Sequence, residues 1–401
     1  MSKKKILFIT GEFVPYTISI GGIIRVYSFI NSLNKSENYI FHEKKKYFGY
    51  YGLKKILKKN NIIHFGKGEK PSEKYIFRFI FKFIRDFLYL LGLDNSFLKL
   101  KYYRNFLSNF LKKVKINYII ISAPPFSLFY LVNDIKSKYP DIKIILDYRD
   151  GWSSRFSEDK FQLLKRFQVT NEKRILQLAD YILCSTLSIH KSISSITQKK
   201  KVFYISNGFL KSNSKNNKKI NYKININKIN IGYFGLVSDS SNSYRDLNVI
   251  YESINRIKKF NIFFDFYGNS KIESSKIKNF SNFTFKKNLN YTKVMPVMKK
   301  YDYLLILHTE KCTVKEVSTG KLYDYLASER PIIALTNGKS EAGKIVKKLK
   351  VGLEIDYSLD SLDNFFMNLK KNYKIQKNKK MINFYSRDYQ NNKLKKIIYG
   401  G

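Results

Sequence analysis

Short apolar runs separated by longer polar or amphipathic segments recur along the whole chain. They lie at residues 4–11, 118–123, 142–148, 181–184, 201–206, 229–235, 261–268, 303–308 and 331–336. Runs of this length bounded by glycine or polar residues are typical of buried strands. Buried strands that alternate with helices belong to parallel, doubly wound sheets. The pattern therefore predicts an α/β fold.

The two halves of the chain open alike, each with an apolar strand that ends in glycine, which predicts two domains of one class. Residues 209–228 are rich in asparagine and lysine, as expected of a linker. We therefore expect a first Rossmann-like domain over residues 1–208 and a second over 229–384. A last helix is predicted over 385–401. A chain of 401 residues can form two cores.

Residues 74–113 form an insertion between the second and third strands of the first half. Phe, Tyr and Leu alternate there with Lys and Arg, and Arg78, Lys82, Arg85 and Asp86 interrupt the apolar runs, so no membrane span is predicted. A basic, aromatic helix pair suits the surface of an anionic membrane. The alternative is a pair of core helices with a solvated basic face.

The formal net charge of +44 indicates a polyanionic partner, either nucleic acid or an anionic membrane. No nucleic-acid-binding motif is present, so we expect no nucleic-acid partner and favour the membrane. The basic start of the chain leads into a short strand that ends at Gly11, which is not the pattern of a signal peptide. The expected location is the cytoplasm, peripheral on the inner face of the cell membrane.

Cysteine and histidine suggest neither a disulfide framework nor a metal site. Cys184 and Cys312 lack a C-x-x-C partner, and the four histidines are scattered without metal-ligand spacing. No pair of acids lies at a strand end in the way that a divalent metal site needs. We therefore expect no cofactor and no bound metal.

The segment EVSTGKLYDYL at residues 316–326 carries the most specific chemistry. It follows an apolar strand, opens with small residues that include Thr319 and Gly320, and then turns helical. A helix N-terminus offers free backbone N–H groups to an anion, and Lys321 adds a full charge. The carboxylates of Glu316 and Asp324 can accept hydrogen bonds from sugar hydroxyls. These groups together suit a nucleotide sugar, although an ordinary strand–helix unit with a solvated acid at each end would show the same residues.

This segment resembles the glutamate-x7-glutamate element of the glycosyl transferases group 1 family, which are retaining enzymes of GT-B fold. In this chain the element reads K-L-Y-D-Y-L and is followed by a Pro-Ile-Ile strand, with Asp324 in place of the usual glutamate. The resemblance extends to EKRILQLAD at 172–180 and KVFYISNGF at 201–209. It implies two Rossmann-like domains that face a central cleft, with Glu316 and Lys321 at the reacting sugar and Asp324 at the ribose.

Gly21 and Gly22 precede Arg25 at the start of a helical pattern soon after the first strand. Glycines let a backbone approach a phosphate, so this position, which matches the glycine loop of the family, is a donor-binding candidate. A plain loop is the alternative. Arg25 is placed on the acceptor side.

The segment LDYRDGW at residues 146–152 ends a strand and resembles the R-D-x-W element of bacterial polysaccharide transferases of the same group. Residues just beyond the carboxyl end of a parallel strand face the ligand site. Asp150 is therefore a catalytic candidate, with Arg149 and Trp152 on the acceptor side. Alternatively, Arg149 and Asp150 pair only to fix the loop.

In the second half, Gly235 and Gly268 each end a strand, and Arg245 stands just before a helix. The family grips the donor diphosphate with basic residues in this region, which makes Arg245 and Lys321 the candidates. Gly235 and Gly268 are expected beside the nucleotide.

The resemblance implies a retaining glycosyltransferase that moves a sugar from a nucleoside diphosphate to a glycan acceptor, one carried on a lipid for surface polysaccharide or lipopolysaccharide. The expected partners are the nucleotide sugar, the glycan or lipid-linked acceptor and the anionic membrane surface. Two alternatives stay open: an epimerase or phosphorylase of the same fold, and a non-catalytic subunit that partners another transferase.

Overall fold

The structure is a computed structural model. It describes residues 3–17, 20–44, 60–65, 82–84, 88, 93–153, 162–210, 228–241, 243, 245–258, 261–268, 270, 272–308, 319–336, 338, 340–369 and 379–400. The chain forms two compact units. The first comprises Met1–Ser206 with Asn391–Gly401, and the second comprises Asn207–Gln390.

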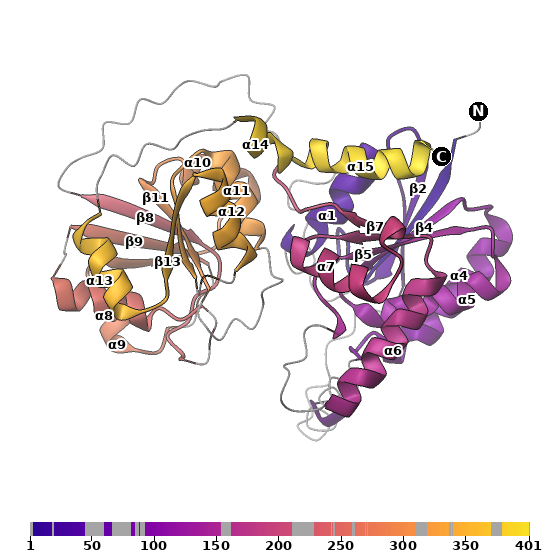
Figure 1. Cartoon of the computed structure of the whole chain (residues 1–401), viewed down its shortest axis with the longest axis horizontal. Helices are drawn as coiled ribbons and strands as arrows, with labels where there is room; N and C mark the ends of the chain where they lie inside the picture. Colours follow the sequence, from indigo (N-terminus) through magenta and orange to yellow (C-terminus); the bar gives the residue numbers. More distant parts are fainter. Residues whose placement is uncertain are drawn as a thin grey trace. The chain divides into compact units, whose positions relative to one another are not determined.

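The first domain is built on a parallel sheet of seven strands in the order β3-β2-β1-β4-β5-β6-β7 (Figure 1). The strands are β1 (Lys5–Thr10), β2 (Glu37–Glu43), β3 (Asn61–Phe65), β4 (Tyr118–Ala123), β5 (Lys143–Tyr148), β6 (Tyr181–Cys184) and β7 (Val202–Tyr204). Because Asn61–Phe65 is itself a strand, the insertion that begins at residue 74 lies between the third and fourth strands, and its expected position between the second and third was wrong.

Helices cover both faces of this sheet. They are α1 (Ile20–Ser32), α4 (Leu100–Lys113), α5 (Leu131–Lys138), α6 (Gln162–Leu178), α7 (Leu187–Ile196) and α15 (Arg387–Tyr399), with short 3-10 turns η1 (Phe97–Lys99), η2 (Phe126–Tyr130) and η4 (Lys199–Lys201). Successive side chains of a strand point to opposite faces. In β1, Ile6 and Phe8 accordingly join the core under α1 and α15, whereas Leu7 and Ile9 join the core under α4 and α5.

Residues 391–401 complete the first domain, although they follow the second domain in the sequence. Leu394 and Ile398 of α15 are fully buried in the core that also contains Phe29 of α1. The Asn391 amide donates to the Ser28 carbonyl at 2.9 Å, which fixes α15 along α1. Figure 1 shows α15 in yellow beside α1.

The second domain contains a parallel sheet of six strands in the order β10-β9-β8-β11-β12-β13. The strands are β8 (Ile229–Phe234), β9 (Ile262–Tyr267), β10 (Phe283–Lys286), β11 (Tyr303–Leu307), β12 (Ile332–Thr336) and β13 (Gly352–Asp356). The helices are α8 (Asn248–Ile257), α9 (Ser275–Lys278), α10 (Tyr291–Met298), α11 (Gly320–Ser328), α12 (Glu341–Leu349), α13 (Leu359–Met367) and α14 (Lys379–Phe384).

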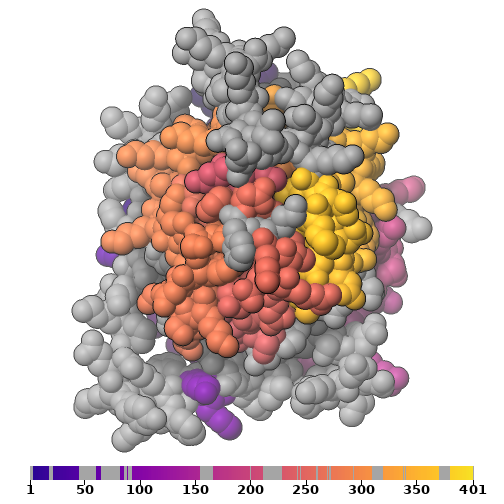
Figure 2. Space-filling view, turned by 90° about the vertical axis from the view of Figure 1, so that its left-hand side faces the viewer, coloured from indigo at the N-terminus to yellow at the C-terminus, as the bar shows by residue number. Residues whose placement is uncertain are grey.

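The second sheet is also covered on both faces. Helices α8 and α13 pack on one core, and α11 and α12 on the other. Figure 2 shows α13 in yellow directly beside the salmon surface of the α8 region. The Arg256 guanidinium joins α8 to α13 through the Asp363 carboxylate at 2.9 Å. The prediction of an α/β fold with two parallel sheets is confirmed.

In each sheet the strand order reverses direction at one point, between β1 and β4 in the first and between β8 and β11 in the second. Open parallel sheets bind ligands outside the carboxyl ends of the strands at this switch point. The fold thus indicates one candidate site in each domain.

Candidate functional site

In the second domain the switch point is formed by the ends of β8 and β11, which pair through Tyr303 and Ile231. Gly235 follows β8 and His308 follows β11. The N-terminus of α11 lies at the same end of the sheet, near the carboxyl ends of the strands, because α11 is the crossover helix from β11 to β12. Three segments of the chain therefore meet there.

Gly235 and Gly268 make a close backbone contact that no other residue permits. Gly235 has φ of +142°, where side chains are strongly disfavoured, and an ideal Cβ on Gly268 would lie 2.3 Å from the Gly235 carbonyl oxygen. A Cβ on Gly235 would also lie 2.6 Å from Cε and 2.8 Å from Nζ of Lys321. Lys321 thus packs against Gly235, and Gly268 packs against Gly235 in turn.

Lys321 lies in the first turn of α11 and reaches back over β8. Its ammonium donates a 2.5 Å hydrogen bond to the Tyr233 hydroxyl and stands 4.0 Å from the centre of the Tyr233 ring. Burial, and secondarily the positive charge of Arg245, lower the pKa of Lys321 well below its usual value. A bound anion would oppose both effects, because it favours the charged ammonium.

Arg245 and His308 lie near Lys321, the first as a second cation and the second as a neutral side chain. Burial, together with the positive charges of Lys321 and Arg245, lowers the pKa of His308 to about 3, so the imidazole is neutral at physiological pH. The His308 side chain is only 3% exposed and its Nδ1 lies 3.4 Å from the Ser340 hydroxyl. Sequence reasoning missed this residue, although its place at the carboxyl end of a parallel strand is a usable signal.

Thr319 and Gly320 begin α11. Thr319 is the N-cap residue, and the space above Gly320 is open, since no described protein atom lies within 4 Å of its ideal Cβ position. The first N–H groups of a helix have no partner within the helix and favour anions. Glu316, the predicted catalytic acid, lies outside the described residues.

Asp324 follows Lys321 by one helical turn. Burial raises the pKa of its carboxyl group to about 6, while the nearby guanidinium of Arg387 opposes the shift. A buried carboxylate has lost hydrogen bonds to water, so it is a good acceptor for hydroxyl donors of a ligand. Lys321 and Asp324 therefore lie within one turn of the same helix.

In the first domain, the predicted glycine loop already has a carboxylate beside it. Gly21 and Gly22 lie in the first turn of α1, and an ideal Cβ on Gly22 would be 2.3 Å from Oε1 of Glu12. The other oxygen of Glu12 accepts a 3.1 Å hydrogen bond from the Thr17 hydroxyl. A negative group at this helix start disfavours a phosphate there, so the structure does not favour Gly21 and Gly22 as a donor phosphate site.

Arg149, just after β5, connects this strand end to the first turn of α1 and to the end of β4. Its guanidinium donates to the carbonyls of Gly22 and Pro124 and, at 3.3 Å, to that of Ala123. Burial lowers the pKa of Arg149, and the carboxylates of Asp147, Asp150 and Glu12 oppose the shift. Arg149 thus shapes the switch point of the first sheet. Asp150 lies beside it, half-buried, at the end of β5.

Arg25, expected on the acceptor side, is instead buried inside the first domain. It is 2% exposed, and its guanidinium contacts the Asp147 carboxylate, which is 0% exposed, at 2.8 Å. Asp147 also accepts a 2.8 Å hydrogen bond from the Ser122 hydroxyl. The pair joins α1 to β5 in the core, where a ligand cannot reach it.

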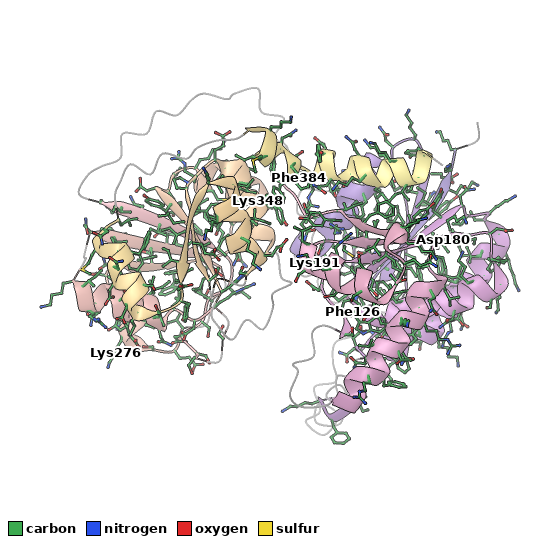
Figure 3. The ribbon with its side chains drawn as sticks, viewed as in Figure 1. Phe126, Asp180, Lys191, Lys276, Lys348 and Phe384 are labelled. Atoms are coloured by element: carbon green, nitrogen blue, oxygen red, sulfur yellow. The ribbon has the colours of Figure 1, made fainter. Side chains whose placement is uncertain are left out.

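Trp152 is likewise buried rather than exposed to an acceptor. It is 3% exposed and stacks on Phe126, labelled in Figure 3, with ring centres 5.5 Å apart and planes 4° apart. Its ring also packs edge-on against Phe129 and Tyr130. Trp152 therefore fixes the loop after β5 as part of the core.

Among the described residues, no group of three or more His, Cys, Asp or Glu side chains could hold a metal ion. The charges that gather at the second switch point are positive, which suits an anionic ligand.

No protein-family model matches the chain, and no curated protein matches its sequence. Solved structures match it in three dimensions. A sucrose-phosphate synthase from Thermosynechococcus elongatus has a TM-score of 0.68 at 10% identity, covering 99% of both chains. The lipopolysaccharide outer core galactosyltransferase WaaB has a TM-score of 0.59 at 14% identity, covering 99% of both chains.

A UDP-GlcNAc 2-epimerase from Methanocaldococcus jannaschii, in complex with UDP-GlcNAc and UDP, has a TM-score of 0.54 at 13% identity and covers 99% of this chain and 100% of its own. The chain has the GT-B fold. At these identities the likeness concerns the fold, so the activity is argued from the residues of the site.

Proposed function

We propose that the protein is a glycosyltransferase that uses a nucleoside-diphosphate sugar. The observation that carries the proposal is the position of Lys321 at the N-terminus of α11, against Gly235 and the Tyr233 ring, with Arg245 close enough to lower its pKa. Two cations and a helix N-terminus at the switch point of a GT-B domain suit a diphosphate.

In this proposal the departing diphosphate is the group that the site stabilises. Negative charge develops on the diphosphate as its bond to the sugar breaks, and fixed positive groups lower the energy of that state. Neutral His308 adds a hydrogen-bonding group without adding charge. Asp324 accepts hydrogen bonds from the ribose, and Glu316 holds hydroxyls of the donor sugar.

We further propose that the sugar is transferred with retention of its anomeric configuration. The diphosphate oxygen takes the proton of the attacking acceptor hydroxyl on the same face of the sugar, so no protein nucleophile is required. No metal or other cofactor takes part in this scheme.

The acceptor is proposed to be a glycan, carried on a lipid, that binds the first domain near Asp150. Asp150 stands at the carboxyl end of β5 and is half-buried. The route would serve the synthesis of surface polysaccharide or lipopolysaccharide.

An anionic membrane is the proposed location of the enzyme, on its cytoplasmic face. Helix α4 buries Leu100, Tyr103, Leu107 and Leu111 in the first core and presents a different side to solvent. Exposed apolar and basic residues gather at the start of α4 and in the turn η1 before it. They are Phe97 and Leu98 of η1 with Lys101 and Tyr102 of α4, which we call the α4 surface. The buried side of α4 fits the interpretation as a core helix, and the exposed α4 surface is the part that we propose contacts the membrane. Arg78 and Arg85 lie outside the described residues.

None of the described helices is long and apolar enough to cross a membrane. Attachment through the α4 surface would need lysines near headgroups and apolar side chains below them.

The test is a panel of UDP-, GDP-, dTDP- and ADP-sugars. The melting temperature of the protein should rise with one of them. With a lipid-linked acceptor, that donor should then give a glycosylated product, which mass spectrometry detects. Isomerisation of the donor without transfer would identify an epimerase. Binding with no turnover in the presence of acceptors would instead indicate a non-catalytic subunit.

A further inference from the structure

The first domain contains a second concave site, at the opposite end of its sheet from the switch point. A cavity of about 590 Å³ lies elsewhere, under α13, but this one, of about 640 Å³, is lined by an unusual number of lysines. We call it the lysine pocket. The residues that line it include Lys4, Lys112, Lys113, Lys115, Lys138 and Lys143.

The pocket lies where the strands begin. Asn117 precedes β4 and connects it to its neighbours, because its amide N–H donates to the Lys5 carbonyl at 2.9 Å and its carbonyl accepts from the Lys143 N–H at 3.1 Å. The last turns of α4 and α5 form the walls. Ligands of the proposed transfer reaction bind at the carboxyl ends of the strands, so the lysine pocket is separate from that reaction.

Composition alone does not explain the lysines. Six of the fifteen lining residues are lysine, whereas Lys and Arg together make up 75 of the 401 residues of the chain. The pocket volume falls in the range of about 300–1,000 Å³ that small-molecule sites occupy.

Two of the lysines are held by protein groups. Lys143 lies 3.1 Å from the Asp180 carboxylate, and Lys4 donates to the Ile398 carbonyl at 2.5 Å. Asp180, labelled in Figure 3, also pairs with Lys136 at 2.8 Å. Among the described residues, Lys113, Lys115 and Lys138 are exposed and have no ion-pair partner.

The charge of the pocket exceeds what the protein itself neutralises. Lysines in the last turn of a helix are favoured by the partial negative charge there, about half a unit for each of α4 and α5. Asp141 and Asp180 remove two more positive charges. Of the six lysine charges, about three remain after the helix ends and the two aspartates are subtracted. The helix ends therefore do not account for all the lysines.

The floor of the pocket is apolar. Ile116, Tyr118 and Ile142 line it and are 5%, 8% and 7% exposed. A ligand that fits therefore has an anionic group for the lysines and a less polar part for this floor.

We propose that the lysine pocket binds a molecule with a diphosphate or comparable multiply charged phosphate group. Phosphate oxygens accept hydrogen bonds from several ammonium groups at once, and lysine binds phosphate as a compact charge. The phosphate belongs either to a soluble compound or to a lipid headgroup. The site is independent of the proposed transferase activity.

The experiment compares two triple variants with the same loss of charge. Lys113→Gln/Lys115→Gln/Lys138→Gln alters the pocket, and Lys276→Gln/Lys278→Gln/Lys293→Gln alters exposed lysines of the second domain, of which Lys276 is labelled in Figure 3. Both are made in a Lys321→Ala background, so that the diphosphate site of the second domain does not contribute. Titration calorimetry with inorganic pyrophosphate measures binding.

We expect the pocket variant to bind pyrophosphate about 10-fold or more weakly than the control variant, because it loses charge-assisted hydrogen bonds. Pyrophosphate should also slow hydrogen exchange at residues 111–118 and 138–143 in the control variant only. Equal affinity in the two variants, with unchanged exchange at these residues, would overturn the proposal.

Vesicles distinguish the source of the phosphate. If phosphatidic acid vesicles retain the control variant better than the pocket variant, and pyrophosphate releases it, the ligand is a lipid headgroup. If pyrophosphate binds but neither variant prefers these vesicles over phosphatidylcholine, the ligand is soluble. Absence of both effects contradicts the site.

Discussion

Lys321 and Tyr233 are in direct contact, with the ammonium 2.5 Å from the phenol oxygen and 4.0 Å from the ring centre. The contact links the first turn of α11 to the carboxyl end of β8. The face of the aromatic ring stabilises the cation and replaces part of the hydration that the cation loses on burial. A cation with little hydration then interacts strongly with an incoming anion. This pair is the natural place to begin testing the proposed donor site.

Lys321→Met should weaken binding of a nucleoside diphosphate by about 10- to 150-fold, the effect of losing one charge-assisted hydrogen bond of about 1.5–3 kcal/mol. Calorimetry of the two proteins with the nucleotide identified by the donor panel measures the change. Lys348→Met, which removes an exposed lysine in α12, is the control and should bind as the wild type does. Equal affinities for all three proteins would contradict the assignment.

The lowered pKa of Lys321 adds a proton signature to this binding. In the free protein the pKa lies below 10.5, and a bound diphosphate raises it again, so binding takes up protons at pH values between the lowered pKa and 10.5. Titrations at about pH 9 in buffers of different ionisation enthalpy should show this uptake in the wild type. Lys321→Met should abolish it.

Glu316→Ala should lower kcat for sugar transfer by about 100-fold or more, since its carboxylate is proposed to hold the donor sugar where positive charge develops. The melting temperature should stay unchanged. Glu310→Ala removes an acid six residues earlier in the sequence and serves as the control. Near-normal kcat/KM for Glu316→Ala would show that this segment is not the active site.

Asp324→Asn should stabilise the protein at neutral pH and weaken nucleotide binding. The pKa of Asp324 rises from 3.8 to about 6 on folding, so the unfolded state loses its proton first and stability falls as the pH rises through this interval. The penalty is fully present above about pH 6 and amounts to at most about 3 kcal/mol.

Urea unfolding at about pH 7.5 and pH 4 measures this effect, and the gain of Asp324→Asn should shrink at the lower pH. Asp360→Asn, at a side chain that is 91% exposed, should show no such pH dependence. An unchanged nucleotide Kd for Asp324→Asn would show that the carboxylate does not contact the ribose.

Arg25→Met should destabilise the first domain by about 3–5 kcal/mol, because it leaves the buried Asp147 carboxylate without its partner. Arg104→Met is the matched control, since the Arg104–Asp134 pair has the same 2.8 Å separation but is exposed. An exposed pair contributes about 1 kcal/mol or less. Equal losses of the free energy of unfolding in the two variants would contradict the interpretation of Arg25 as a core residue.

Leu98→Ser/Tyr102→Ser should reduce binding to anionic vesicles by about 10-fold or more, since each large apolar side chain gains about 1.5–3 kcal/mol when it leaves water. These residues are 54% and 62% exposed on the α4 surface. Co-sedimentation with phosphatidylglycerol vesicles measures the change. Leu187→Ser/Met367→Ser, at exposed positions elsewhere, should sediment as the wild type does.

The sheets could be predicted from the sequence because each central strand is a continuous apolar run that is buried on both faces. YIIISA at residues 118–123 coincides with β4, and PIIAL contains the start of β12. Shorter strands with acidic or polar residues gave no such signal. β13 (Gly352–Asp356) reads GLEID, and β10 has four residues, so neither stood out from loop sequence.

The candidate site was predictable where it depends on a local element and not where it depends on distant partners. Gly235 and Lys321 were identified from the strand end and helix start that contain them. Arg25 was misplaced because its partner, Asp147, is 122 residues away and a helical pattern does not show which neighbouring strand offers a carboxylate. Trp152 was misplaced for the same reason, because its stacking partner Phe126 belongs to another loop.

The place of residues 391–401 in the first core has a consequence for the order in which the protein is made. Leu394 and Ile398 fill the face of the first sheet next to α1, yet the whole second domain, Asn207–Gln390, precedes them on the ribosome. The second domain can close its cores as soon as it has emerged, while the first domain keeps an apolar face uncovered until its last segment arrives. The domain that is synthesised first is therefore the one that is finished last.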